Sequence, residues 1–448
     1  MAAWEDAPPS RKGARAHPHG GGGGRARDAL VFAAGAAAAV VALLVVPSVL
    51  GPAPGVSLPA AGFFPAATGP EAAARTFYDD PELAYTVDRR VTGWDAKRAR
   101  WLRSRGLLRG ATAPERVVMV SGSRPEPCPG DHLLLRFLKN KLDYCRLHGV
   151  ELFYNRALLQ PDMNAYWAKI PVVRAAMLAH PEAEWVWWVD ADAVFTDMDF
   201  SLPLAKYAGH NLVVYGWHKE VYEVRSWVGL NAGVFLIRNC QWSLDLMDEW
   251  ARMGPASPEY ARWGKTLKDT LSNKPDAESD DQSALVYLLL KNSERWGNKT
   301  YIETDYYFQG YWAEIVDRLD GVAARYQAVE RGDGAAAAEL RRRHAEREHL
   351  QYAARRNAAV REAVPGPDGG GQSGWRRPFV THFTGCQPCD GKGNPAYSWK
   401  SCHDGIRRAL DFADDQVLRA YGFRHAAPLD DAVVPLPFDY PAKRAGSK

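Results

Sequence analysis

The apolar run at residues 185–189, Trp-Val-Trp-Trp-Val, most constrains the fold, because Asp190 and Asp192 follow it directly. Consecutive large apolar residues are typical of a strand buried inside a sheet. A buried strand that ends at two carboxylates, one residue apart, predicts a polar site at the end of a central strand.

Short apolar segments alternate with amphipathic ones around this run. We expect strands at residues 117–120, 151–154 and 185–189 and helices at residues 132–148 and 166–178. Strands that alternate with helices predict an α/β domain with a mostly parallel sheet. In such a sheet the ligand lies at the carboxyl ends of the strands.

The N-terminal region contains a segment without charged residues, from Ala29 to Leu50. About 20 apolar residues span a bilayer as a helix. Arginine and lysine residues precede the segment and favour a cytosolic N-terminus. We therefore predict an uncleaved type II signal anchor, with the rest of the chain in the lumen. The alternative is a cleaved signal peptide, whose apolar core is commonly about 7 to 15 residues long.

Composition divides the chain into parts. We predict a disordered cytoplasmic tail (1–28), a transmembrane signal anchor (29–50), a luminal stem (51–112) with one helix near residues 94–107, and a catalytic domain (113–441). Residues 321–375 are rich in Ala, Arg and Glu and read as a surface insertion. Within them, residues 340–364 are predicted to form one charged, solvated helix.

Net charge and aromatic content narrow the class of partner. A net charge of +3 gives no electrostatic reason to expect nucleic acid. The chain has 16 Trp and 19 Tyr residues, which suit stacking on sugar rings, although a large aromatic core is an equal alternative. Asn298 heads an Asn-x-Thr sequon and is a predicted glycosylation site.

The cysteines allow two interpretations. Cys386 and Cys389 form a Cys-x-x-Cys pair, and a zinc site would have to add Cys402 or His403. In an oxidising lumen we prefer disulfides that involve these cysteines.

Asp190 and Asp192 are the main metal candidates. Mn²⁺ and Mg²⁺ take oxygen ligands, and such an ion can bridge a diphosphate and carry the charge of a leaving nucleotide. The alternative is a turn or a helix cap. A second Asp-x-Asp, Asp197 with Asp199, lies in an exposed-looking turn and is not expected to bind metal. His382 could complete the metal site, although a lone His is more often structural.

Two further segments carry polar residues of interest. Asp280, Asp281 and Gln282 precede an apolar helix, where acidic residues cap as readily as they catalyse. Asn231 lies among small residues at 229–233, which allow close approach of the backbone to a ligand or form a tight turn.

Four segments, in this order, resemble plant glycosyltransferase family 34, which includes xyloglucan 6-xylosyltransferases and galactomannan galactosyltransferases. The segments are WVWWVDADAVFTDMDF (185–200), SWVGLNAGVFLIRNCQWSLDLMDEWARMGP (226–255), SDDQSALVYLL (279–289) and FVTHFTGCQPCDG (379–391). The resemblance extends over residues 115–441 apart from 321–375.

This resemblance implies a GT-A fold, a Rossmann-like nucleotide-sugar transferase domain, in a type II protein of the Golgi membrane. It also implies a retaining transfer from a UDP-sugar with Mn²⁺ (or Mg²⁺). By position, the implied metal ligands are Asp190, Asp192 and His382, and the implied catalytic residues are Asp280, Asp281 and Gln282. The implied donor contacts are Ser121, Asn155, Lys169, Asp190, Gly385 and Gln387, and Asn231 is assigned to the acceptor.

Gln387 departs from the xylosyltransferases, which have Lys at this position, and is more similar to the galactosyltransferase branch. We expect transfer of xylose to the 6-hydroxyl of a β-1,4-glucan or mannan backbone, in xyloglucan biosynthesis. The alternatives are a galactomannan α-1,6-galactosyltransferase and a non-catalytic Golgi partner of an active transferase, within a homo- or hetero-oligomer. A carbohydrate hydrolase would not explain Asp-x-Asp at a strand end.

Overall fold

The computed structural model describes residues 80–81, 83–110, 113–125, 131–363, 376–386, 396–427 and 432–437. These residues belong to one compact unit, Arg75–Lys448. The predicted tail, the signal anchor, most of the stem, Cys128, Gln387 and Cys389 lie outside the described residues. Within the described residues, no helix is both long and apolar enough to cross a bilayer.

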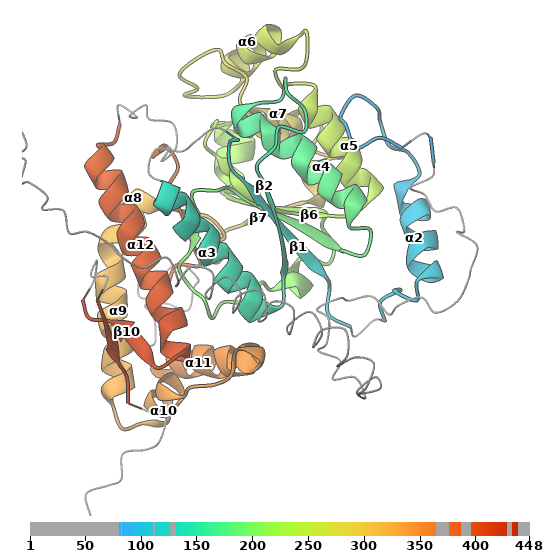
Figure 1. Cartoon of the computed structure of the whole chain (residues 1–448). Helices are drawn as coiled ribbons and strands as arrows, with labels where there is room; N and C mark the ends of the chain where they lie inside the picture. The colour runs from blue at the N-terminus through green and yellow to red at the C-terminus, as the bar shows by residue number, and fades with distance from the viewer. Residues whose placement is uncertain are drawn as a thin grey trace, which may run out of the picture. The chain divides into compact units, whose positions relative to one another are not determined.

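A six-stranded sheet forms the centre of the domain, in the order β2-β1-β3-β6-β5-β7 (Figure 1). The strands are β1 (Val117–Gly122), β2 (Glu151–Asn155), β3 (Trp185–Val189), β5 (Leu212–Gly216), β6 (Leu230–Arg238) and β7 (Thr300–Glu303). β6 is antiparallel to β3 and β5, whereas the other neighbouring pairs are parallel. An α/β domain with a mostly parallel sheet and the three predicted strands are therefore confirmed.

Helices cover both faces of the sheet. One face carries α4 (Lys169–Ala179), α5 (Gln241–Ala251) and α7 (Asp281–Lys291), with α6 (Tyr260–Thr270) packed against α7. The other face carries α3 (Asp131–His148), α8 (Trp312–Ile315) and α12 (Trp399–Ala420). α3 confirms the helix predicted at 132–148. The helix predicted at 166–178 begins as a 3-10 turn, Ala165–Ala168, and continues as α4.

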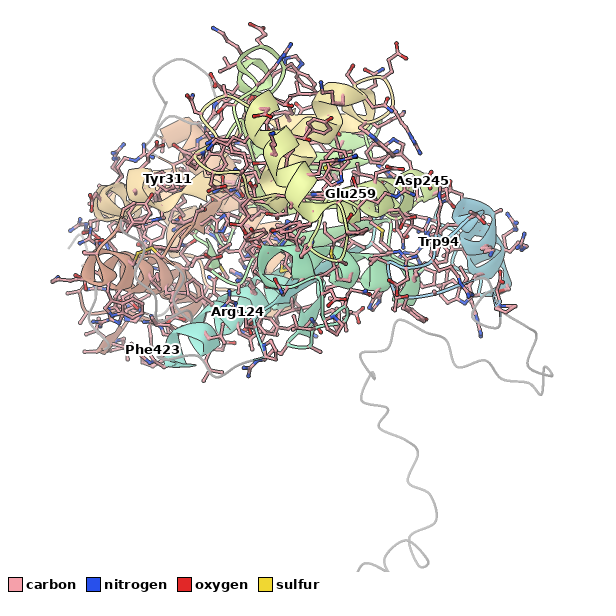
Figure 2. The ribbon with its side chains drawn as sticks, turned by 90° about the horizontal axis from the view of Figure 1, so that it is seen from above. Trp94, Arg124, Asp245, Glu259, Tyr311 and Phe423 are labelled. Carbon is pink, nitrogen blue, oxygen red and sulfur yellow. A yellow bond between two sulfur atoms is a disulfide. The ribbon has the colours of Figure 1, made fainter. Side chains whose placement is uncertain are left out.

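Helix α2 (Trp94–Ser104) shifts the boundary that we drew between stem and domain. Trp94 is fully buried, and its indole Nε1 donates a hydrogen bond to Asn239 Oδ1 at 2.8 Å. Figure 2 labels Trp94 on α2 beside Asp245 of α5, and Asp245 accepts a hydrogen bond from Arg90 at 2.7 Å. The folded domain therefore begins before α2 rather than at residue 113.

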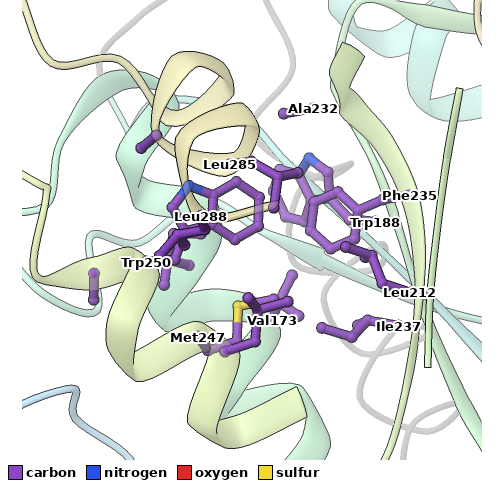
Figure 3. Close-up of a cluster of buried hydrophobic side chains, with 14 of the residues drawn as sticks. Val173, Trp188, Leu212, Ala232, Phe235, Ile237, Met247, Trp250, Leu285 and Leu288 are labelled. Carbon is purple, nitrogen blue, oxygen red and sulfur yellow. The ribbon is translucent and has the colours of Figure 1, made fainter. Parts of the chain in front are cut away.

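The apolar run of β3 is buried from both sides because its alternate residues point in opposite directions. Trp187 lies in the cluster beneath α3, α8 and α12, whereas Trp188 lies in the cluster beneath α4, α5 and α7. Figure 3 shows Trp188 in this second cluster with Phe235, Trp250 and Leu285. This two-sided packing holds the end of β3, and the carboxylates after it, in a fixed place.

A second, three-stranded sheet continues from the end of β3. Its order is β4 (Ala193–Phe195), β9 (Val380–His382), β8 (Gly310–Tyr311). β4 and β9 are antiparallel and pair Ala193 with His382 and Phe195 with Val380. This pairing brings the segment around His382 next to the segment that follows Asp192.

The segment 321–375 differs from the prediction of one solvated helix at 340–364. Its described part contains most of α9 (Leu319–Arg331), then α10 (Ala335–Arg341) and α11 (His349–Ala363), with a break after Arg341. α11 packs on α3 and buries His349, Ala353 and Val360. The described part of the segment is therefore packed into the domain. After α12, β10 (Phe423–His425) and β11 (Val433–Pro435) form an antiparallel pair.

Candidate active site

Asp190, Asp192 and His382 meet at the carboxyl end of β3. One ligand atom from each residue lies within 4.8 Å of the other two. His382 Nε2 is 3.1 Å from Asp192 Oδ1 and 3.8 Å from Asp190 Oδ2. The two carboxylates keep 25% and 22% of their side-chain surface exposed, whereas His382 keeps 4%. Two oxygen ligands, one imidazole and an open side fit a divalent cation such as Mn²⁺.

His382 and the neighbouring carboxylates shift one another's pKa values. Burial lowers the pKa of His382, but the Asp192 carboxylate more than offsets this, so the His382 pKa is raised. Burial raises the pKa of Asp192, but the nearby His382 imidazole opposes this, and the Asp192 pKa lies below its usual value. A divalent cation bound here would compete with protons for these ligands.

The backbone of the Asp-x-Asp turn is fixed from two directions. Asp190 N donates a hydrogen bond to Gly233 O at 2.8 Å, and Trp188 Nε1 donates to Asp190 Oδ1 at 2.6 Å. From α3, the buried Lys141 Nζ donates to Ala191 O at 2.9 Å and to Ala193 O at 2.8 Å. These bonds hold both carboxylates toward the same side.

Lys169 joins the metal candidates to the acidic start of α7. Its Nζ lies 3.3 Å from Asp190 Oδ1 and 2.8 Å from Asp281 Oδ2. Burial lowers the pKa of Lys169, but Asp190 and Asp281 together more than offset that, so its pKa is raised. Burial raises the pKa of Asp281 to about 6, against the opposing effect of Lys169. Since Lys169 is only 4% exposed, it contacts these carboxylates from the buried side of the site.

Asp280 behaves as a helix cap, which was the alternative to catalysis at this position. Its Oδ1 accepts a hydrogen bond from Ser283 N at 2.7 Å, and its Oδ2 accepts one from Ser283 Oγ at 2.7 Å. Lys274 also pairs with Oδ2. The Asp280 carboxylate is therefore occupied by structural contacts, and Asp281 is the acidic residue turned toward Lys169 and Asp190.

Gln282 and Asn231 connect α7 to the start of β6. Asn231 Nδ2 donates to Gln282 Oε1 at 3.3 Å, and Gln282 Nε2 donates to Trp227 O at 3.1 Å. Asn231 Oδ1 accepts from Gly233 N at 2.8 Å. Both amides thus contact the start of β6, which supports Asp190 through Gly233, and contact of Asn231 with an acceptor stays a prediction.

The predicted donor contacts Ser121 and Asn155 lie at the carboxyl ends of β1 and β2, beside β3. Ser121 is buried, and its Oγ has no hydrogen-bond partner among the described residues. Asn155 Nδ2 donates to Ala157 O at 2.7 Å. Gly385 follows β9 with a φ of 86°, which a glycine adopts readily. None of the described contacts joins Ser121 or Asn155 to the metal candidates, and Gln387 lies outside the described residues.

Gly233 belongs to the small-residue segment singled out in the sequence, whereas two further contributors, Gln309 and Lys141, escaped the sequence analysis. A Cβ atom on Gly233 would lie 2.3 Å from His382 Cε1 and 2.6 Å from Asp190 Oδ2, so a larger residue does not fit. Gln309 Nε2 lies 3.3 Å from His382 Nδ1. Lys141 could have been found, because helical spacing from Phe137 places it on the apolar face of α3.

The second Asp-x-Asp was predicted wrongly to lie in an exposed turn. Asp197 and Asp199 are 6% and 7% exposed. Asp199 Oδ2 accepts hydrogen bonds from Arg356 Nε at 3.0 Å and from Arg377 Nη1 at 3.2 Å. The turn looked exposed in the sequence because the arginines that pair with Asp199 come from distant segments of the chain.

Two luminal features of the prediction can be located. A disulfide joins Cys386 to Cys402, with 5.6 Å between the Cα atoms, so these two thiols are not zinc ligands. Cys145 and Cys240 are free. Asn298 is exposed within a 3-10 turn, and its glycosylation stays a prediction.

Comparison with known proteins gives consistent matches. A sequence profile of the galactosyl transferase GMA12/MNN10 family matches residues 113–393. Probable glycosyltransferase 6 of Oryza sativa subsp. indica is 68% identical over 445 residues, 93% of this chain and 92% of that protein. Galactomannan galactosyltransferase 1 of Cyamopsis tetragonoloba is 54% identical over 372 residues, 82% of this chain and 82% of that protein.

Similarity to solved structures is low. A glycosyltransferase involved in glycosylation of the major capsid of PBCV-1 aligns with a TM-score of 0.31 and 13% identity, over 43% of this chain and 83% of that chain. The galactosyltransferase LgtC, solved with donor and acceptor sugar analogues, aligns with a TM-score of 0.29 and 10% identity, over 66% and 95%. Scores this low carry no argument about the fold or the substrate.

Proposed function

Because this chain belongs to the galactosyl transferase GMA12/MNN10 family, glycosyltransferase family 34, and is therefore a glycosyltransferase, we propose that it transfers galactose from UDP-galactose to the 6-hydroxyl of a β-1,4-mannan. The similarity to the galactomannan galactosyltransferase of Cyamopsis supports this donor and acceptor. Gln387, which lacks the charge of the lysine found in the xylosyltransferases, also favours galactose. The xylosyl transfer to a β-1,4-glucan expected from the sequence is the second candidate.

The observation that carries the proposal is the cluster of Asp190, Asp192 and His382, with its partly exposed carboxylates. These residues would hold Mn²⁺ or Mg²⁺. When bound, such an ion supplies positive charge that stabilises the departing UDP. A non-catalytic partner would have no need of this cluster, so its presence favours catalysis.

The surrounding residues orient the reaction. Lys169 holds the Asp190 and Asp281 carboxylates in one place, and Lys141 holds the backbone of the Asp-x-Asp turn. In a retaining transfer, positive charge develops on the sugar, and the negative field of Asp281 would stabilise it. The acceptor hydroxyl would approach from the same face as the leaving phosphate.

An exposed indole offers a surface for the acceptor. Trp217 directly follows β5, is 47% exposed, and donates its backbone N–H to Gly229 O at 2.9 Å. Gly229 directly precedes β6, whose second residue is Asn231. Sugar rings stack on aromatic faces, so Trp217 would hold one backbone residue of the polysaccharide near Asn231.

The proposal includes a type II protein of the Golgi membrane with the catalytic domain in the lumen. The uncharged segment Ala29–Leu50, the Cys386–Cys402 disulfide and the exposed Asn298 support this location. Endoglycosidase should shift the gel mobility of the protein expressed in plant cells but leave an Asn298→Gln variant unshifted. Equal mobility of the untreated and treated protein would remove the luminal assignment of this site.

The transfer is tested with the purified full chain, Mn²⁺, UDP-galactose or UDP-xylose, and manno- or cello-oligosaccharides. We expect galactosylated manno-oligosaccharides, with the linkage read by NMR. Preference for UDP-xylose and cello-oligosaccharides would replace the proposal by the second candidate. No product from a folded, metal-binding sample would favour a non-catalytic partner.

A matched pair of variants tests the metal cluster. Asp192→Asn should lower turnover by about 100-fold or more and abolish the thermal stabilisation by Mn²⁺. Asp317→Asn, at an exposed carboxylate outside the site, should change neither. Unchanged turnover of Asp192→Asn would remove the metal assignment.

A further inference from the structure

A cavity of about 400 Å³ lies outside the candidate active site. It is lined by residues of α9, α11, α12 and β10 and of the connection between α10 and α11. Figure 1 shows these elements gathered on one side of α3. A cavity of this size accommodates a small molecule, and none of its lining residues belongs to the metal cluster.

The lining of the cavity is rich in arginine. Seven arginines and five carboxylates contribute to it, and two of the arginines, Arg342 and Arg408, pair with Glu339 and Asp317 outside the lining. Arg356 and Arg377 share a single carboxylate, Asp199, and these three side chains are 11%, 13% and 9% exposed. Burial raises the pKa of the nearby Asp197 to about 7, which reduces its negative charge near neutral pH. A buried positive charge without a counter-charge is costly, so this region favours an anion.

A further arginine reaches the cavity from the other side. Arg424 on β10 donates from Nη1 to His425 O at 3.1 Å, and it forms no ion pair with a carboxylate among the described residues. By contrast, Arg419 is balanced by Glu330 at 2.7 Å and Asp415 at 3.0 Å. Arg424 is therefore available to a ligand, whereas Arg419 is committed to the fold.

The lining also includes apolar and aromatic surface. Tyr326, Leu340 and Phe412 line the same cavity, and the Arg377 guanidinium lies 4.1 Å from the centre of the Tyr326 ring. Guanidinium groups match phosphate oxygens in pairs of parallel hydrogen bonds. We propose that this cavity, with Arg356, Arg377 and Arg424, binds a small molecule that carries a phosphate group and an apolar or ring-shaped part.

Two short strands connect this cavity to the metal cluster. β4 runs between Asp192 and the turn that contains Asp199, and β9 runs between Arg377 and His382. The two strands pair with each other, Ala193 with His382 and Phe195 with Val380. At about 3.5 Å per residue, the chain from Asp192 to Asp199 spans at most roughly 25 Å. A ligand bound at Arg377 would therefore lie at the start of the segment that leads through β9 to His382.

Binding is tested on the purified full chain in EDTA, so that no probe is held by a metal at the active site. Inorganic phosphate, UMP and galacturonate are titrated by calorimetry, and thermal unfolding is followed in parallel. We expect UMP to bind and to raise Tm, with inorganic phosphate weaker. Binding of inorganic phosphate as tight as UMP would overturn the proposed role of the apolar and aromatic lining and leave a site for the free anion. Binding of galacturonate alone, or of no probe, would overturn it.

Variants locate the binding. Arg356→Gln and Arg424→Gln should each weaken UMP binding about tenfold or more, through loss of a charged hydrogen bond. Arg424→Gln is the decisive variant, because Arg356→Gln also removes a partner of buried Asp199 and could unfold the protein. Arg355→Gln, on the same helix but paired with Glu339 and outside the lining, is the control. Undiminished binding in Arg424→Gln, or an equal loss in Arg355→Gln, would refute the site.

Discussion

Gly233 offers a sharp test of the metal cluster, because a single added methyl group would enter it. A Cβ atom at this position would lie 2.3 Å from His382 Cε1 and 2.6 Å from Asp190 Oδ2. Gly233 O also accepts the hydrogen bond from Asp190 N at 2.8 Å. The backbone therefore has little freedom to retreat, and Gly233→Ala should displace His382 and Asp190 instead.

The size of the effect follows from these distances. Carbon atoms rest at about 3.5–4.0 Å, so the His382 ring would have to move by about 1 Å or more. A misplacement of about 1 Å at a reacting centre costs roughly 100-fold in rate. Overpacking of this kind destabilises by about 1–3 kcal/mol, which leaves the domain folded. We expect Gly233→Ala to lose about 100-fold in kcat and to need more Mn²⁺ for half-maximal activity.

The assay is sugar transfer at saturating donor across a Mn²⁺ titration, with circular dichroism to confirm the fold. The control is Gly321→Ala in α9, where an added Cβ has no atom within 4 Å, so activity should be unchanged. A Gly233→Ala variant with normal turnover and normal Mn²⁺ response would refute the reasoning, because the ligand geometry would then not depend on this close contact.

Three further outcomes are expected. Trp217→Ala should raise the acceptor KM roughly tenfold, through lost apolar contact, with little change in donor KM. An acceptor KM equal to that of the unsubstituted protein would exclude stacking on this indole. Trp94→Ala should lower the free energy of unfolding by about 3–5 kcal/mol in urea titrations, because the side chain is fully buried, whereas a loss below about 1 kcal/mol would mean that α2 is only loosely attached. Burial raises the pKa of Asp197 to about 7, so the native carboxyl keeps its proton where the unfolded chain, with an ordinary pKa of about 4, has lost it. The contribution of Asp197 to stability should therefore fall as pH rises from about 4 to about 7, and Asp197→Asn should become more stable relative to the unsubstituted protein across this window. A constant difference in stability between the two proteins would contradict the buried, protonated state.

Local patterns sufficed for the elements that build the central sheet. Strands β1, β2 and β3 and helix α3 lie where apolar runs and helical spacing predicted them, although β2 is an edge strand without a fully buried residue. The burial of α2, by contrast, was missed. Trp94 lies in a charged segment, and contacts with distant residues such as Asn239 and Gln241 make it part of the domain.

The candidate site was partly readable in the same way. Asp190 and Asp192 stand at the end of a strand whose burial is plain from five apolar residues. Gly233 was readable only as part of a small-residue segment, and Gln309 was not readable, because their contacts with His382 arise only when separate segments meet. The sequence also could not show that Asp280 caps the helix while Asp281 pairs with Lys169, because this depends on contacts seen only in the structure.

The sequence by itself determined the fold class, the family and the strand that ends in two carboxylates, because these depend on residues that are neighbours along the chain. Only the tertiary structure decided that β9 pairs with β4 and so brings His382 to Asp192 across 190 positions. It also decided that Asp199 is buried against Arg356 and Arg377 rather than exposed. The physical reason is the same in both cases. The partner of a strand or of a buried charge depends on packing between distant segments, and local periodicity does not predict that packing.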